Sequence, residues 1–240
     1  MASDPFQNEI GGYLMTQGAS EGGEPGPALS RRLFLFGAPA LLAGCNEAGH
    51  LSAAFSGTYG PLQDNGVSVP AIDTSQFDAR FLRQTVPFSG REAPGTIIVE
   101  TNNRFLYYVL PGGNAVRYGI GVGRDGFALR GNAVVGHKNV WPRWTPTPNM
   151  MARDPSLRKY AGGMPGGINN PLGARALYLY RGGRDTLYRI HGTNEPWSIG
   201  RAMSSGCIRM LNQDAIDLYN RVRPGATVIV RHGPALVASR

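Results

Sequence analysis

The sequence predicts a mainly β fold with one or two short helices. Glycine and proline together account for 52 of the 240 residues, 34 and 18 respectively, and this share favours turns and short strands over long helices. Short runs of β-branched and aromatic residues, which are typical of strands, stand between the turns. Only residues 213–222 clearly have the apolar spacing of a helix. A hydrophobic fraction of 42% is enough for a packed core.

Three strands are expected in the first part of the domain. Residues 96–100 and 104–110 are apolar and aromatic runs on either side of a turn at 102–103, and a second turn at 111–113 leads into a third run, 115–120. Short strands joined by tight turns favour an antiparallel meander.

The next stretch alternates strand-like and irregular sequence. Residues 127–135 resemble a strand that Gly131 breaks. The run W-P-R-W-T-P-T-P at 141–148 excludes a regular helix or central strand, because proline lacks the N–H that both use. We expect a loop there that covers the core or walls a groove. Residues 149–160 favour a short helix, interrupted at Pro155.

A loop and a hairpin are expected to follow. Residues 161–170 contain four glycines and a proline, which favours an irregular loop of the kind that often lines a site. Residues 174–180 and 187–190 have strand composition around a turn at 182–183. His191 is expected at the end of the second of these strands.

The C-terminal part contains the expected helix and a last strand. Asn212 is a suitable N-cap for residues 213–222, because its side chain can accept a hydrogen bond from the first turn. The P-G pair at 224–225 ends the helix. The apolar run 226–230 predicts a fully buried strand.

The N-terminal part carries an export signal. Residues 1–29 are polar and lack apolar periodicity, which favours disorder. The sequence S-R-R-L-F-L at 30–35 resembles a twin-arginine signal, and the apolar run that follows is too short to span a bilayer. It ends in L-A-G-C at Cys45, which resembles the lipobox of bacterial lipoproteins. An ordinary signal peptide cleaved near Gly44 is the alternative to lipidation of Cys45.

The positive charge is interpreted together with export. The chain has a net charge of +8 and a pI of 9.9, which favours anionic partners such as nucleic acid, anionic lipid or cell-wall polymer. Removing residues 1–44 leaves 22 basic and 12 acidic side chains, a net charge of +10. An exported protein meets little nucleic acid, so we expect the wall or an anionic leaflet and no nucleic-acid partner.

A glycine motif at 121–126 invites a nucleotide-binding interpretation. The sequence G-V-G-R-D-G matches the dinucleotide fingerprint G-x-G-x-x-G. However, the fingerprint needs a following helix and an acidic residue about 20 positions on, and the sequence predicts neither. These glycines are better explained by turns and close backbone approach.

His191 and Cys207 are the candidate reactive pair. Cys207 is the only cysteine beyond Cys45, and a lone thiol in an oxidising compartment is a liability unless it reacts. A histidine can take the thiol proton to give the nucleophilic thiolate. His191 then needs a partner for its second ring nitrogen, either the nearby Glu195 or a backbone carbonyl such as that of Gly192.

The surroundings of the thiol suggest further roles. Gly206 allows close approach of substrate, and the amides of Gly206 and Cys207 can stabilise an oxyanion. Arg209 can favour the thiolate or hold a carboxylate, and a purely structural Arg209 is the alternative. We expect no metal site, because only four histidines are present and no second cysteine is available.

The motifs H-G-T at 191–193 and S-S-G-C-I-R-M at 204–210 are similar to those of the L,D-transpeptidase (YkuD) catalytic domain. The resemblance extends over residues 95–231. It implies a β-sandwich, a nucleophile at Cys207, a base at His191 and an orienting carbonyl at Gly192, with Arg209, Ser205 and Gly206 as substrate-binding residues. It implies no cofactor.

Two positions depart from the family pattern. Ser205 stands where a histidine is frequent, and Leu129-Arg130-Gly131 replaces the usual T-P-x-G stretch. The second change affects the acceptor side of the groove.

The expected activity is acyl transfer from a peptidoglycan tetrapeptide stem to an amine, which releases D-Ala and forms a cross-link. The alternatives are an L,D-carboxypeptidase, an enzyme that attaches an envelope protein to peptidoglycan, and a non-catalytic wall-binding lipoprotein. The expected partners are stem peptides and, through Cys45, a membrane. We expect a location in the periplasm or cell envelope.

The expected organisation has four parts. Residues 1–44 form the extension and signal peptide, and residues 45–93 form a linker in which Phe77 to Phe88 can dock on the domain edge. Residues 94–232 form the catalytic domain, and residues 233–240 a tail.

Overall fold

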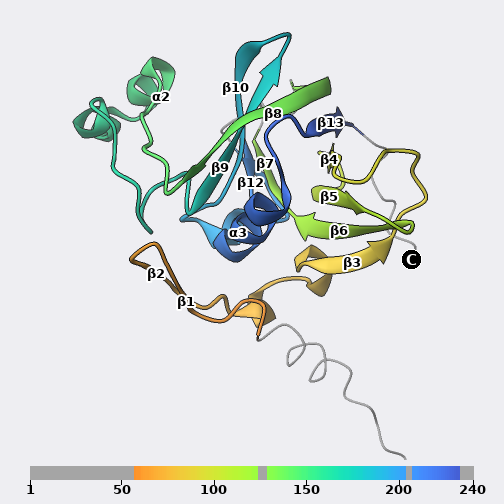
Figure 1. The fold of residues 1–240 in the computed structure, drawn as a ribbon. Helices are drawn as coiled ribbons and strands as arrows, with labels where there is room; N and C mark the ends of the chain where they lie inside the picture. The colour runs from red at the N-terminus through yellow and green to blue at the C-terminus, as the bar shows by residue number, and fades with distance from the viewer. Residues whose placement is uncertain (1–56, 124–128, 204–206, 233–240) are drawn as a thin grey trace, which may run out of the picture. The chain divides into compact units, whose positions relative to one another are not determined.

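The computed structural model describes residues 57–123, 129–203 and 207–232, and its main feature is a mixed sheet (Figure 1). The sheet has eleven strands in the order β11-β7-β12-β10-β9-β8-β13-β4-β5-β6-β3, and β1 and β2 form a separate pair. The strands are β1 (Leu62–Asp64), β2 (Val67–Val69), β3 (Gln84–Pro87), β4 (Ile97–Glu100), β5 (Phe105–Leu110), β6 (Asn114–Gly119), β7 (Gly121–Gly123), β8 (Gly131–Val140), β9 (Arg175–Arg181), β10 (Arg184–His191), β11 (Ala202–Met203), β12 (Ile208–Arg209) and β13 (Thr227–Arg231). The helices are α2 (Pro148–Arg153), α3 (Asn212–Arg221) and the short 3₁₀ turns η1 (Thr74–Gln76), η2 (Ala79–Phe81), η4 (Pro155–Tyr160) and η5 (Pro196–Ser198).

The expected meander and hairpin are both present. Strands β4, β5 and β6 pair antiparallel in sequence order, as do β9 and β10. Strand β8 differs from the expectation, because it starts at Gly131 and runs to Val140. The pairing of β8 with β9 shifts register at Gly136, where the ring of Tyr180 fills the space in which a side chain would stand. The glycine is therefore a packing requirement in this strand.

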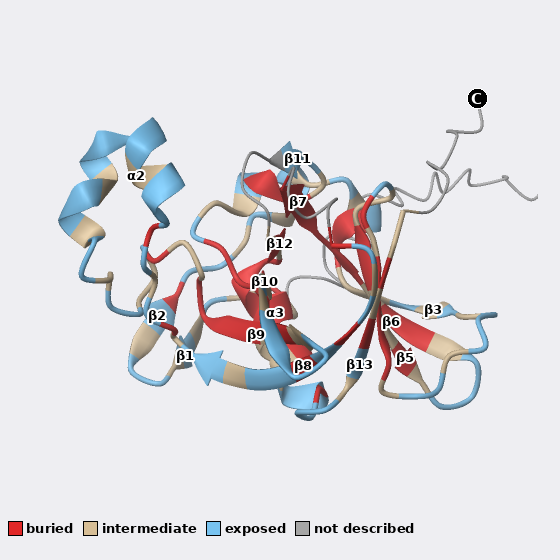
Figure 2. Ribbon diagram, turned by 90° about the horizontal axis from the view of Figure 1, so that it is seen from above, coloured by how far each residue is buried: buried red, intermediate tan, exposed pale blue. Residues whose placement is uncertain are grey.

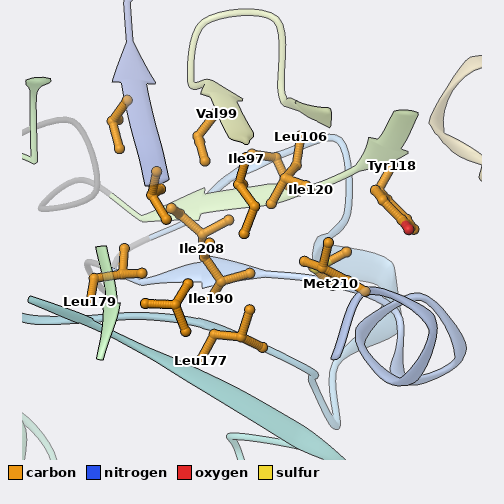
Figure 3. Packing of buried hydrophobic residues seen from close by; sticks show 14 of the residues in the cluster. Ile97, Val99, Leu106, Tyr118, Ile120, Leu177, Leu179, Ile190, Ile208 and Met210 are labelled. Atoms are coloured by element: carbon orange, nitrogen blue, oxygen red, sulfur yellow. The ribbon is translucent and has the colours of Figure 1, made fainter. Parts of the chain in front are cut away.

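One core connects the two halves of the sheet. Ile97 and Leu106, from β4 and β5, belong to the same buried cluster as Leu177 and Ile190, from β9 and β10 (Figure 3). Each large apolar side chain fully buried in this way contributes about 1.5–3 kcal/mol. The strands β9 and β10 belong to one half of the sheet order, and β4 and β5 belong to the other half. Because both halves contribute to this core, the sheet packs against itself as two layers, in agreement with the expected β-sandwich.

The helices lie close to the expected positions. Helix α2 ends before Pro155, and Asp154 caps the η4 turn that follows by accepting a hydrogen bond from the Ser156 N–H. No residue of α2 or η4 is buried, which Figure 2 shows as pale blue and tan. Helix α3 starts one residue earlier than expected. Asn212 is its first residue and not its N-cap, because its side chain bonds to two other segments.

Residues 57–93 do not form the expected linker. From Tyr59 onward this segment packs on the domain, and β3 extends the sheet by pairing with β6. Phe81 is buried against Gly119 and Gly200, where a side chain on either glycine would clash with it. The docking expected of Phe77 to Phe88 is present, because Phe81 and Leu82 are buried. Tyr59 and Val69 are also buried, and the sequence did not indicate them, because they follow no periodic pattern. Residues 45–56 lie outside the described residues.

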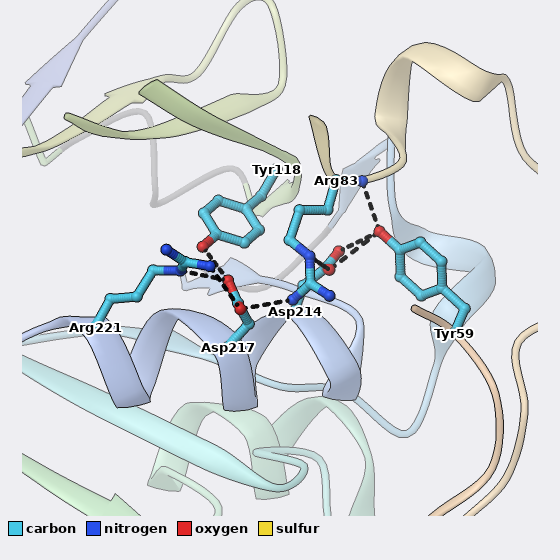
Figure 4. Close-up of polar contacts among 6 residues, drawn as sticks. All are labelled: Tyr59, Arg83, Tyr118, Asp214, Asp217 and Arg221. Carbon is cyan, nitrogen blue, oxygen red and sulfur yellow. Dashed lines mark hydrogen bonds and ion pairs between the residues drawn. The ribbon is translucent and has the colours of Figure 1, made fainter. Parts of the chain in front are cut away.

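A buried carboxyl group fixes this N-terminal segment to α3. The Tyr59 hydroxyl donates to both oxygens of Asp214, at 3.0 and 3.1 Å, and the Arg83 guanidinium lies 3.9 Å away (Figure 4). Asp214 is fully buried. Burial raises the pKa of Asp214 to about 7, although Arg83 and the Tyr59 hydroxyl favour the charged form.

A second acid one helical turn later extends the same contact. Asp217 accepts hydrogen bonds from the Tyr118 hydroxyl at 2.5 Å and from Arg221 at 2.8 and 3.0 Å. Arg83 lies 3.1 Å from Asp217 and so faces both acids (Figure 4). The N-terminal segment, β6 and α3 are therefore joined by one polar network.

Asp214 predicts a pH dependence of stability. Its pKa is about 7 in the folded chain and about 3.9 when unfolded, so its favourable contribution is complete below pH 4 and is lost as the pH rises to 7. Across that window, wild-type protein should lose stability relative to Asp214→Asn by about 1.4 kcal/mol per pH unit. Urea unfolding of both proteins at pH 4, 5.5 and 7 measures the difference. Parallel pH profiles would contradict the assignment.

Candidate active site

His191 is the last residue of β10 and is only 4% exposed. Its Nδ1 lies 2.5 Å from the carbonyl oxygen of Gly192. A carbonyl oxygen only accepts hydrogen bonds, so Nδ1 carries the proton and Nε2 keeps a lone pair. Of the two orienting partners considered from the sequence, the structure pairs His191 with the Gly192 carbonyl.

The environment keeps the His191 ring neutral. Burial, together with the charges of Arg209 and Arg189, lowers the pKa of His191 to about 4, against the hydrogen bond to Gly192. At pH 7 the ring is therefore an unprotonated base whose Nε2 can accept a proton. This is the state that activation of a thiol requires.

Cys207 is partly buried and directly precedes β12. Strands β12 and β10 are parallel, with Ile208 beside Ile190, and both isoleucines lie in the core. Side chains alternate between the two faces of a sheet. With this register continued by one residue, Cys207 and His191 both lie on the face opposite the core, on adjacent strands.

Arg209 shares that face and lies beside His191 in the register. Its Nη1 is 2.5 Å from Glu195 Oε2, and the two side chains are 14% and 41% exposed. Solvent weakens a pair with such an exposed partner, so it adds little stability. Glu195, which the sequence suggested as a partner for His191, instead bonds Arg209.

The glycines of the G-V-G sequence line the same face. Strand β7 pairs antiparallel with β12, and the Gly123 N–H donates to the Cys207 carbonyl at 3.3 Å. A side chain on Gly121 would stand 2.7 Å from the Ser198 carbonyl oxygen. The structure thus supports close backbone approach as the reason for Gly121. Ser205 and Gly206, the other expected substrate-binding residues, lie outside the described residues.

Asn212 supports the His191 segment, a role that its sequence position did not indicate. Its Oδ1 accepts from the Ala174 N–H at 2.9 Å, and its Nδ2 donates to the Thr193 carbonyl at 3.0 Å. A side chain on Gly192 would approach Asn212 Oδ1 to 2.3 Å. On the other side of Gly192, the His191 carbonyl accepts a hydrogen bond from the Met210 N–H. Hydrogen bonds therefore fix both His191 and Thr193, the residues that flank Gly192.

Among the described residues, no group of three or more His, Cys, Asp or Glu side chains could hold a metal ion. No helix in the described part of the chain is long and apolar enough to cross a membrane.

Asn212→Ala should slow modification of Cys207. The substitution removes both hydrogen bonds and lets the Gly192 carbonyl, and with it the His191 ring, move. We expect at least a tenfold slower reaction of Cys207 with a neutral alkylating agent, and a stability loss of about 1–3 kcal/mol.

Gln213→Ala is the matched control. Gln213 is also a buried amide, and it donates to the Pro70 carbonyl at 2.9 Å, away from His191. It should lose stability without a change in alkylation rate. Equal slowing in both variants would show that Asn212 has no specific role at the site.

Comparison with known proteins identifies the family. The model of the L,D-transpeptidase catalytic domain matches residues 94–230. Escherichia coli strain K12 proteins named probable L,D-transpeptidase YcfS and probable L,D-transpeptidase ErfK/SrfK are 36% and 38% identical over 163 and 145 residues. These matches cover 66% and 58% of this chain, and 49% and 44% of the relatives. The chain thus spans about half the length of these relatives.

A solved structure from Brucella melitensis, described as a probable carnitine operon oxidoreductase caia, is 47% identical with a TM-score of 0.46, and covers 63% of this chain and 94% of that one. The family match extends over more than half of the chain and includes both His191 and Cys207. The chain belongs to the L,D-transpeptidase catalytic-domain family.

Proposed function

We propose that this protein is a cysteine-dependent peptidoglycan L,D-transpeptidase. The observation that carries the proposal is the fixed His191 ring, whose Nδ1 is bound to the Gly192 carbonyl while Nε2 remains a base on the Cys207 side of the sheet. Membership of the family supports the reaction type. The neutral state of His191 at pH 7 supports its role as the base.

The proposed reaction has two acyl transfers. His191 Nε2 takes the Cys207 proton, and the thiolate attacks the carbonyl that joins the L-centre of diaminopimelate to the terminal D-Ala. The amine of D-Ala leaves with the proton from His191, which yields a thioester. An amine of a second stem then attacks the thioester, His191 takes its proton and returns it to the thiol, and a cross-link forms. The Gly192 carbonyl orients the imidazole, and Arg209, Ser205 and Gly206 contact the substrate.

Substituting Cys207→Ala tests the nucleophile. Wild-type protein should gain the mass of one carbapenem molecule through a thioester, and should release D-Ala from a tetrapeptide stem. Cys207→Ala should do neither. Cys45→Ser removes the other cysteine of the chain and should keep both activities in detergent solution. An adduct on Cys207→Ala would overturn the proposal.

The acceptor is tested separately. Muropeptides from cells with and without the gene should differ by cross-linked stems that lack the terminal D-Ala. Accumulation of uncross-linked tripeptides would instead indicate a carboxypeptidase, and loss of a wall-bound protein would indicate an attachment enzyme. Unchanged muropeptides and no adduct would favour a non-catalytic wall-binding protein.

Export and a lipid anchor are part of the proposal. The twin-arginine-like sequence and the L-A-G-C sequence at Cys45 support an acylated, membrane-attached protein in the cell envelope. Cys45→Ser should therefore move the protein from the membrane fraction to the soluble fraction after cell lysis. The same distribution for both proteins would contradict the anchor.

A further inference from the structure

A row of side chains continues the Cys207 face across three strands. In the strand register, Arg189 of β10 lies beside Tyr178 of β9, and Tyr178 lies beside His137 of β8. The register between β10 and β12, continued by one residue, places Cys207 beside Arg189. Neighbouring strands are about 4.8 Å apart, so Arg189 starts within one strand spacing of the thiol.

The row is ordered by stacking. The His137 and Tyr178 rings lie 3.9 Å apart at an angle of 16°, and the Arg189 guanidinium lies 4.3 Å from the Tyr178 ring centroid. Because β9 runs between β8 and β10, the imidazole and the guanidinium lie on opposite faces of the phenol ring. The guanidinium is therefore held in one orientation before any ligand arrives.

Asp185 completes a two-charge site. Arg189 Nη1 and Nη2 donate to its two carboxylate oxygens at 2.7 and 2.8 Å. Burial opposes ionisation, but hydrogen bonds from Arg189 and the Leu187 N–H keep the pKa of Asp185 below its usual value. The Asp185 and Arg189 side chains are 33% and 14% exposed. Solvent thus reaches both a fixed cation and a fixed anion on β10, the strand beside the one that Cys207 precedes.

The backbone beneath the pair is strained. The β9–β10 register is irregular between Asp185 and Arg189, and Leu187, within this irregularity, has a φ of +65° and is 78% exposed. A leucine rarely adopts this conformation. Strained residues of this kind are often associated with binding sites. Here the bulge brings the two charged side chains together on one face.

We propose that the Arg189–Asp185 pair binds a zwitterionic amino-acid group of the substrate. Asp185 would repel a simple anion, and Arg189 would repel a simple cation. A carbon that carries both an ammonium and a carboxylate matches both charges, with the carboxylate on Arg189 and the ammonium on Asp185.

This inference rests on the proposed transpeptidase function. Diaminopimelate carries a second amino-acid centre at the end of its side chain, with both groups free. Three methylene groups separate it from the centre whose carbonyl Cys207 attacks, which suits binding on a strand about 4.8 Å away. The pair therefore selects donor stems with an unmodified second centre.

The test compares D-Ala release from three stems: the free tetrapeptide, one with the second-centre carboxylate amidated, and one with the second-centre amine acetylated. Wild-type protein should show at least a tenfold lower KM for the free stem than for either modified stem. Arg189→Met should lose the discrimination against amidation, and Asp185→Asn should lose the discrimination against acetylation. Arg181→Met removes the same charge from β9, where Arg181 bonds the Asn132 carbonyl, and should keep both preferences.

Carbapenem adduct formation separates this inference from the proposed function. The adduct should still form in Arg189→Met and Asp185→Asn, because a carbapenem lacks the second centre. A change in rate through the charge near His191 acts on all three stems alike, so the ratios of their KM values report the subsite. No adduct in wild-type protein would refute the transpeptidase proposal itself. Normal adducts with equal KM for all three stems in wild-type protein, or variants that keep the wild-type ratios between these KM values, would overturn the zwitterion subsite alone.

Discussion

The parallel pairing of β10 with β12 is the constraint on which the site depends. It turns Ile190 and Ile208 into the core, so that the residues on either side of them in sequence must face outward. His191 and Cys207 are sixteen positions apart in the chain but lie on adjacent strands as a result. The same strand register therefore places the isoleucines in the core and the reactive residues on the opposite face of the sheet.

Charge around the pair is balanced at short range. Two guanidinium groups, of Arg189 and Arg209, act on the buried His191 ring, and each is countered by its own carboxylate, Asp185 or Glu195. The His191 ring is buried and lies near two positive charges, so protonation of the ring is unfavourable. The ring therefore stays neutral and can act as a base.

The domain includes more of the chain than the family match. That match begins at residue 94, whereas packing begins near Tyr59. Asp64 accepts two hydrogen bonds from Arg175 at the start of β9, at 2.6 and 2.7 Å, and Tyr59 binds Asp214 two residues after Asn212. The N-terminal segment is thus attached to β9 and to α3, and Asn212 joins α3 to the residue that precedes β9.

The sequence by itself determined the strands of the meander, the β9–β10 hairpin, helix α3 within a residue, and the two reactive candidates His191 and Cys207. These depend on local patterns: apolar runs, turn residues and a short motif. Only the tertiary structure decided the roles of Asn212 and Glu195, the packing of residues 57–76 and the row from Arg189 to His137. Each of these depends on partners far away in the sequence, such as Thr193 and Ala174 for Asn212. A local pattern records which residues prefer a strand, but strand order and register decide which side chains meet.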